Sequence, residues 1–195
     1  MTLTVAITGA SGSVLAKHLL IALEKDERVA RVNLIVSDSG LRVLAEELQI
    51  AGRNDLIPKL IGNESQKLQQ QNNSDIGANV ASGSYPVDGM IVLPCSMGTL
   101  GRIANGIALH LIERAADVCL KQKRPLVLCV RETPFNLIHL RNMTQAAEAG
   151  ATIFPVIPAF YFHPASTEEM AHEFVNRVLA HIGLPQSGAY RWKPE

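Results

Sequence analysis

Three clusters of glycine, hydroxyl, arginine and glutamate residues could carry chemistry, because each directly follows a short apolar run. They are Gly9-Ala10-Ser11-Gly12, Pro94-Cys95-Ser96-Met97-Gly98-Thr99 and Arg131-Glu132-Thr133-Pro134. In an open parallel sheet, ligands bind beyond the carboxyl ends of the strands. Small hydroxyls, an arginine and a glutamate that meet at such ends predict a site for a phosphorylated, planar ligand.

The first cluster is the candidate for phosphate binding. A turn from strand to helix offers free backbone N–H groups and the positive end of the helix dipole, and glycine lets the backbone approach an anion closely. The spacing is Gly-x-x-Gly rather than the dinucleotide fingerprint, with Ala16 where a third glycine is expected. Because a tight turn needs glycine for steric reasons anyway, the motif alone leaves phosphate binding and a structural turn equally open.

The other polar residues also have ordinary interpretations. Ser37 and Ser96 each fit the N-cap of a helix, and Pro94 stands where a nucleophile elbow at Ser96 would need glycine. Arg114 and Asp117 fit a surface pair on one helix. In contrast, the charges at 131–132 directly follow a buried run, which favours contact with a ligand. Residues 155–161 form a rigid aromatic segment that either walls a ring or isoprenoid pocket or is an ordinary packed loop.

Strand-like and helix-like segments alternate along the chain and must position these residues. The apolar runs predict strands at 3–8, 32–36, 89–93, 126–130 and 151–155, and the helical periodicity predicts helices at 14–25, 41–48, 99–109, 111–122, 137–150 and 167–182. This alternation predicts a parallel sheet with helices on both faces. We expect one domain over residues 1–185 and a C-terminal tail over 186–195. The polar stretch 66–73 is predicted to be a surface loop or a frayed helix end.

Composition excludes several classes of protein. Eighteen basic residues balance eighteen acidic ones, so there is no electrostatic case for binding nucleic acid. No apolar stretch approaches the ~18 residues of a membrane span. The three cysteines, Cys95, Cys119 and Cys129, lack metal or redox spacing and are expected to be buried, reduced thiols in a cytoplasmic protein. The six histidines are scattered, so no metal site is expected.

The motifs together resemble the UbiX/Pad family of flavin prenyltransferases over nearly the whole chain and in order. Beyond the three clusters, the resemblance rests on Leu111-Ile112-Glu113-Arg114-Ala115-Ala116-Asp117, Arg124-Pro125-Leu126-Val127-Leu128, His139-Leu140-Arg141-Asn142-Met143 and Pro158-Ala159-Phe160-Tyr161. It implies a flavodoxin-like or Rossmann-like three-layer αβα sandwich, usually a homododecamer with sites between subunits. It also implies an enzyme that joins a dimethylallyl group from dimethylallyl phosphate to nitrogen 5 and carbon 6 of reduced FMN. The prenylated FMN then serves a UbiD-type decarboxylase, in ubiquinone biosynthesis or aromatic acid decarboxylation.

The resemblance also implies a role for particular residues. The FMN contacts would be Gly9, Ala10, Ser11, Ser37, Ser96, Met97, Gly98, Thr99, Arg114 and Arg131. The prenyl phosphate would be held by Tyr161 and Arg177 with help from Lys121, and Glu132 and Glu47 would line the reacting centre. Lysine and arginine donors suit a leaving phosphate, and no metal is implied. We expect Arg177 or the tail to reach the site of a neighbouring subunit.

Three positions depart from the family pattern: Ala16, Asp38 and Ile76 replace a frequent glycine, a frequent lysine and an occasional tryptophan. The change at 76 bears on prenyl donor preference or rate. Two other functions stay open on the residues alone. One is an FMN-dependent decarboxylase of the peptidyl-cysteine type, which would turn over a thiol peptide without a prenyl donor. The other is an accessory subunit of a decarboxylase complex, which would co-purify with a larger partner.

Overall fold

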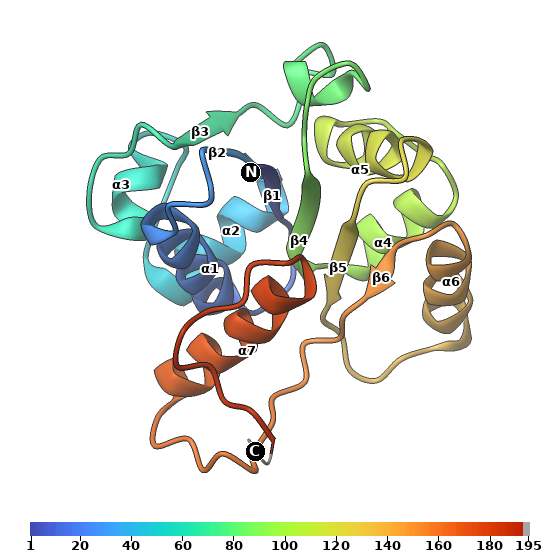
Figure 1. Ribbon diagram of the computed structural model, residues 1–195. Helices are drawn as coiled ribbons and strands as arrows, with labels where there is room; N and C mark the ends of the chain where they lie inside the picture. The colour runs from blue at the N-terminus through green and yellow to red at the C-terminus, as the bar shows by residue number, and fades with distance from the viewer. Residues whose placement is uncertain (193–195) are drawn as a thin grey trace.

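A six-stranded parallel sheet forms the centre of the computed structural model, which describes residues 1–192 (Figure 1). The strands are β1 (Thr2–Ile7), β2 (Arg31–Val36), β3 (Leu68–Gln71), β4 (Gly89–Cys95), β5 (Leu126–Val130) and β6 (Thr152–Ile153). The helices are α1 (Ser13–Lys25), α2 (Asp38–Leu48), α3 (Leu56–Ile61), α4 (Met97–Ala104), α5 (Leu111–Lys121), α6 (Leu137–Glu148) and α7 (Thr167–His181), with a short 3-10 helix η1 (Asn79–Ala81). The predicted α/β sandwich is confirmed.

The strand order is β3-β2-β1-β4-β5-β6, which is the Rossmann order. The chain builds β1, β2 and β3 towards one edge, then crosses back so that β4 pairs with the other side of β1. Where the order reverses, the connections from β1 and β4 pass to opposite faces of the sheet. In sheets of this kind, the crevice that binds ligands lies outside the carboxyl ends of the strands at that point. This topology therefore brings the turn after β1 and the segment after β4 together.

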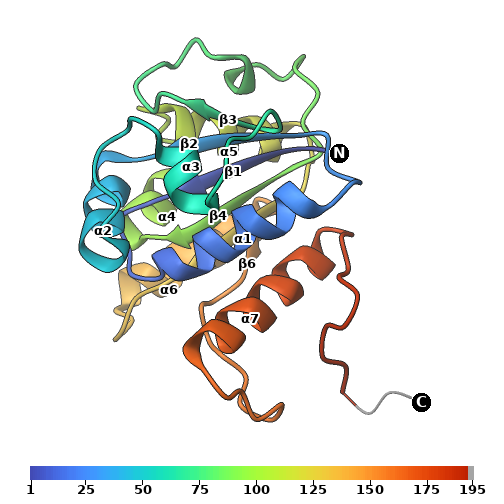
Figure 2. The same ribbon diagram turned by 90° about the vertical axis from the view of Figure 1, so that its left-hand side faces the viewer.

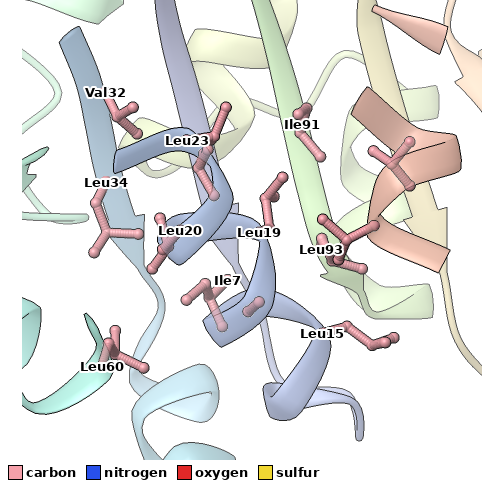
Figure 3. Close-up of a cluster of buried hydrophobic side chains, with 14 of the residues drawn as sticks. Ile7, Leu15, Leu19, Leu20, Leu23, Val32, Leu34, Leu60, Ile91 and Leu93 are labelled. Atoms are coloured by element: carbon pink, nitrogen blue, oxygen red, sulfur yellow. The ribbon is translucent and has the colours of Figure 1, made fainter. Parts of the chain in front are cut away.

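Each face of the sheet buries its own apolar core, because successive strand residues point to opposite faces. On one face, α1, α2, α3 and α7 cover β1, β2, β4 and β5 (Figure 2). Helix α1 forms here because leucines recur along one side of it and lie over Ile7, Leu34 and Ile91, as Figure 3 shows. Full burial of one leucine side chain is worth about 2 kcal/mol, so this stripe fixes the helix to the sheet. On the other face, α4, α5 and α6 cover β4 and β5.

The structure corrects several element predictions. The stretch 66–73, predicted as a loop or frayed helix end, contains the edge strand β3, which pairs with β2. The helix predicted at 99–109 begins at Met97 and ends at Ala104, because Gly106 has a φ of 67°. Helix α3 and η1 were not predicted, and β6 is only two residues long. The strand at Leu126–Val130 and the helix at Leu111–Lys121 agree with the sequence to within one residue.

The C-terminal segment folds back along α1 and α7. Gln186 Nε2 donates a hydrogen bond to Asp26 Oδ2 at 3.0 Å, and the Tyr190 N–H donates to Glu173 Oε2 at 3.3 Å. The predicted tail therefore begins against the body of the protein, whereas its last three positions, 193–195, lie outside the described residues. Within residues 1–192, no helix combines the length and apolarity that crossing a bilayer demands.

Candidate active site

A threonine that the sequence analysis did not single out joins the ends of β1 and β4. The Thr8 hydroxyl donates to the Pro94 carbonyl at 2.9 Å, and its oxygen accepts from the Ser96 N–H at 2.8 Å. Thr8 is buried, so these bonds are shielded from water. The turn after β1 and the turn after β4 are thereby fixed to each other. In the sequence, the only feature that marks Thr8 is its position directly before the glycine turn.

Glu47, from α2, lies at the N-terminus of α1. Its carboxylate accepts hydrogen bonds from the N–H groups of Gly12 and Ser13, the closer contact being 2.7 Å. Burial works against ionisation of this side chain, but the Ser11 hydroxyl and the backbone N–H groups outweigh it and lower the pKa of Glu47. Part of the anion-binding end of α1 is thus already occupied by a carboxylate of the protein itself.

The turn after β1 also packs against the first residues of α2. A Cβ added at Gly9 would lie 2.5 Å from the Cβ and Oγ of Ser39, so only glycine fits there. Ser37 is the N-cap of α2: its Oγ accepts from the Gly40 N–H at 3.0 Å and lies 3.2 Å from Ser39 Oγ. Two hydroxyls therefore stand beside the Gly9 turn at the end of β2.

The residues after β4 and β5 complete the crevice. Ser96 caps α4 by accepting from the Thr99 N–H at 3.3 Å, and Arg131 donates its backbone N–H to the Cys95 carbonyl at 3.1 Å. Glu132 is exposed, and its Oε1 accepts from the Thr133 N–H at 2.9 Å. Of the remaining predicted contacts here, Met97 is buried and Gly98 is exposed. The carboxyl edge of the sheet thus carries hydroxyls at the ends of β2 and β4 and charged side chains at the end of β5.

Tyr161 and Arg177 come together in one hollow of about 420 Å³ beside the segment that follows β6. Tyr161 is half exposed, and its ring contacts Tyr190 and Trp192 at centroid distances of 5.3 and 5.2 Å. A second, mostly apolar hollow of about 180 Å³ reaches from Gly12 to α7. Pro158 lines both hollows, which places an apolar space next to the tyrosine and arginine donors.

Two predicted residues lie elsewhere. Arg114 on α5 donates to the Ala81 carbonyl at 3.0 Å and to Asp117 at 2.6 Å, so it ties α5 to the segment before β4. Lys121 ends α5, just before the chain enters the amino end of β5. It is therefore at the opposite end of the sheet from Glu132 in the same subunit. A shared site that contains Lys121 and Tyr161 requires a second copy of the chain.

The three family departures have different settings. Ala16 is buried on the core side of α1, and only its backbone N–H contacts the turn, by donating to the Gly12 carbonyl at 3.5 Å. Asp38 begins α2, favourably placed for the helix dipole, and forms an ion pair with Arg53. Ile76 is half exposed in the segment after β3. None of these side chains alters the hydroxyls around the crevice.

The three cysteines are free and buried, as predicted. Burial raises the pKa of Cys95 to about 12 and that of Cys119 to about 11, and it raises the pKa of Cys129 as well. All three stay protonated near neutral pH and are poor nucleophiles, including Cys95 next to the crevice. Among residues 1–192, no group of three or more histidine, cysteine, aspartate or glutamate side chains is arranged to hold a metal ion.

A Rossmann-ordered sheet with hydroxyls and an arginine at the carboxyl ends of its strands is typical of mononucleotide- or flavin-binding α/β proteins. The family model described as Flavoprotein matches residues 1–181. The flavin prenyltransferase UbiX of Salmonella typhimurium is 43% identical over 195 residues, which cover 98% of this chain and 97% of that protein. The chain therefore belongs to the UbiX flavin prenyltransferases within the flavoprotein family, as the resemblance predicted.

Solved structures agree with this assignment. The crystal structure of AnUbiX in complex with FMN and dimethylallyl pyrophosphate superposes with a TM-score of 0.88 at 39% identity, covering 100% of this chain and 98% of that one. The dodecameric FMN-dependent UbiX-like decarboxylase from Escherichia coli O157:H7 gives the same TM-score and identity and covers all of both chains. The whole chain, including the segment that carries Tyr161, is thus of the same fold as these proteins.

Proposed function

We propose that this enzyme joins a dimethylallyl group from dimethylallyl phosphate to nitrogen 5 and carbon 6 of reduced FMN. The observation that carries the proposal is the hollow in which Tyr161 and Arg177 stand beside an apolar space at the carboxyl edge of the sheet. A phosphate head and a branched apolar tail need this combination. Support comes from AnUbiX, whose structure holds FMN and dimethylallyl pyrophosphate.

The donor set around the crevice fits FMN. Ser37 and Ser96 bring hydroxyls, and Arg131 is an exposed cation at the end of β5. Glu47 already accepts hydrogen bonds from the N–H groups of Gly12 and Ser13 and from the Ser11 hydroxyl. The proposed contacts with the FMN phosphate therefore fall to Ser37 across the turn, and Ser11 would contact the phosphate by turning its hydroxyl away from Glu47. Gly9, Ala10, Met97, Gly98 and Thr99 form the walls of the same site.

Each side chain has a defined task in this proposal. Bound reduced FMN supplies an electron-rich ring that accepts the allyl group. Tyr161, Arg177 and, from a second copy, Lys121 donate hydrogen bonds to the departing phosphate and neutralise its developing charge. The proton that nitrogen 5 would lose leaves with the departing phosphate. Glu132 would take the proton that carbon 6 must lose and return a proton to the allyl double bond, and Glu47 keeps a negative charge beside the reacting centre. The apolar hollow shields the allyl group from water.

The proposal extends to the assembly of the enzyme and to the protein that uses its product. We propose a homododecamer, as in the UbiX-like decarboxylase from Escherichia coli, in which Arg114 and Lys121 of one subunit complete the site of another. We place the described part of the tail, residues 186–192, at such an interface. The product, prenylated FMN, serves a UbiD-type decarboxylase, in ubiquinone biosynthesis or aromatic acid decarboxylation in the cytoplasm.

Glu132→Gln and Arg177→Ala separate the two proposed tasks. Glu132→Gln removes the base, so finished product should form about a hundredfold more slowly while FMN affinity stays unchanged. Arg177→Ala should raise KM for dimethylallyl phosphate by about tenfold, the worth of one charge-assisted hydrogen bond. Glu148→Gln and Arg42→Ala, on exposed helix positions, are the matched controls in steady-state assays. A wild-type rate in Glu132→Gln would leave the released phosphate as the base.

A further inference from the structure

An ion pair between a buried glutamate and a partly exposed arginine links α4 to α5 next to the crevice. Glu113, in the first turn of α5, is only 3% exposed, and its Oε1 accepts a hydrogen bond from Arg102 Nε at 2.6 Å. Arg102 stands in the last turn of α4 with 38% of its side chain exposed. Glu113 Oε2 has no hydrogen-bond partner within the described part of the chain, and the imidazole Nδ1 of His110 lies 3.9 Å from it.

Stability alone is a poor explanation for this pair. A carboxylate that leaves water loses its hydration, and a single ion pair rarely recovers that loss. Two apolar side chains of similar size would pack between α4 and α5 as well or better. The half-satisfied carboxylate of Glu113 therefore points to a task for the arginine that it holds.

The arginine reaches the crevice through one side chain. Arg102 Nη2 donates to Thr99 Oγ1 at 3.4 Å, and Ser96 Oγ donates to the same oxygen at 3.1 Å. Ser96 Oγ in turn accepts from the Thr99 N–H at 3.3 Å. Because Thr99 Oγ1 accepts both of these hydrogen bonds, the Ser96 proton points to Thr99 and away from the crevice. The lone pair that remains on Ser96 can only accept a hydrogen bond from a ligand.

We propose that Arg102, held in place by Glu113, is a positioning residue that keeps the Ser96 hydroxyl turned as an acceptor towards an N–H group of the flavin ring. The inference rests on the proposed function, because it takes Ser96 as part of the flavin site. Without Arg102, Thr99 can rotate and donate to Ser96. The Ser96 proton then points into the site and meets the ring N–H instead of accepting from it.

The test replaces the ion pair with an apolar pair. The double variant Arg102→Leu/Glu113→Leu is expected to unfold at the same urea concentration as the wild type or a higher one. Its FMN affinity should nevertheless fall by about tenfold, the effect of one lost hydrogen bond, and the absorbance maximum of bound FMN should shift. KM for dimethylallyl phosphate should stay within about twofold, because that hollow does not contain the pair. Wild-type FMN affinity and spectrum in the double variant would overturn the inference.

Arg102→Lys keeps the test decisive if the double variant does not fold. Its ammonium can still pair with Glu113 but lacks the second arm of the guanidinium that reaches Thr99, so the same weaker FMN binding is expected. Unchanged binding and spectrum in Arg102→Lys would also refute the role of Arg102. A wild-type protein that fails to bind FMN would refute the proposed function itself. Normal wild-type binding with unaffected variants refutes only the present inference.

Discussion

At the N-terminus of α1, the Glu47 carboxylate accepts hydrogen bonds from the N–H groups of Gly12 and Ser13. These groups carry part of the positive end of the helix dipole, so a negative side chain there stabilises the helix. A motif that suits a phosphate is thus partly occupied by the protein itself. A sequence pattern cannot reveal this, because Glu47 comes from a different helix.

Glu47→Gln should make the free energy of unfolding less dependent on pH in the acid range. The pKa of Glu47 is lowered from its ordinary value of 4.5, so its contribution is fully present above that value and is lost as pH falls through the lower folded-state pKa. We expect Glu47→Gln to be about 0.5 kcal/mol less stable at pH 7, a small effect because most of the side chain is exposed and its charge is screened by water. Urea unfolding at pH 7 and pH 3 measures it. An equal difference in unfolding free energy between variant and wild type at both pH values would contradict the role of the Glu47 charge.

At the scale of elements, the turn after β1 and the start of α2 touch so closely that glycine is required. Gly9→Ala should cost about 2 kcal/mol, because its Cβ would overlap Ser39. Gly98→Ala is the matched control, since its Cβ would meet only Arg102 at an ordinary 3.7 Å. The additional change Ser39→Gly removes the overlapping atoms. It should therefore recover part of the lost free energy of unfolding, which urea unfolding measures. Full additivity of the two changes would show that the contact does not set the cost.

Long periodic segments were predictable from sequence, and short or polar ones were not. The leucine stripe of α1 and the apolar run of β5 carry their own signal. β3 is formed by Leu-Gln-Gln-Gln, an edge strand whose pairing with β2 comes from tertiary contacts rather than β propensity. In the candidate site, hydroxyls at strand ends were visible from the pattern. The Thr8 bridge and the Arg102–Glu113 pair were not, because they join distant segments.

At the scale of the whole molecule, the sheet separates the predicted phosphate donors. Tyr161 and Arg177 lie beyond its carboxyl edge, whereas Lys121 precedes the amino end of β5. Apolar side chains are also exposed in two groups, one around α6 and the preceding loop and the other around residues 157–161. The proposed homododecamer would account for both features, because copies of the chain would cover these groups and exchange donors between sites.

The exposed apolar face of α6 gives a direct test of assembly. Ile138 is 65% exposed on α6 and Leu109 is 68% exposed in the adjoining loop, where Asn105 donates a hydrogen bond to Asn142. Ile138→Asp should lower the mass measured by light scattering and reduce prenyl transfer with it, because sites lose their neighbouring subunit. Asn63→Asp, an exposed position beyond α3, should leave the mass unchanged. A fully active wild-type monomer would refute shared sites.

The mass of the flavin released after anaerobic incubation with reduced FMN and dimethylallyl phosphate tests the central claim most directly. We predict a flavin heavier by one dimethylallyl unit, absent when either the protein or the prenyl donor is omitted. An accessory subunit would leave the flavin unchanged in isolation. A peptidyl-cysteine decarboxylase would also leave it unchanged, while it turned over a thiol peptide without the donor. Flavin of unaltered mass from protein that binds FMN would contradict the account.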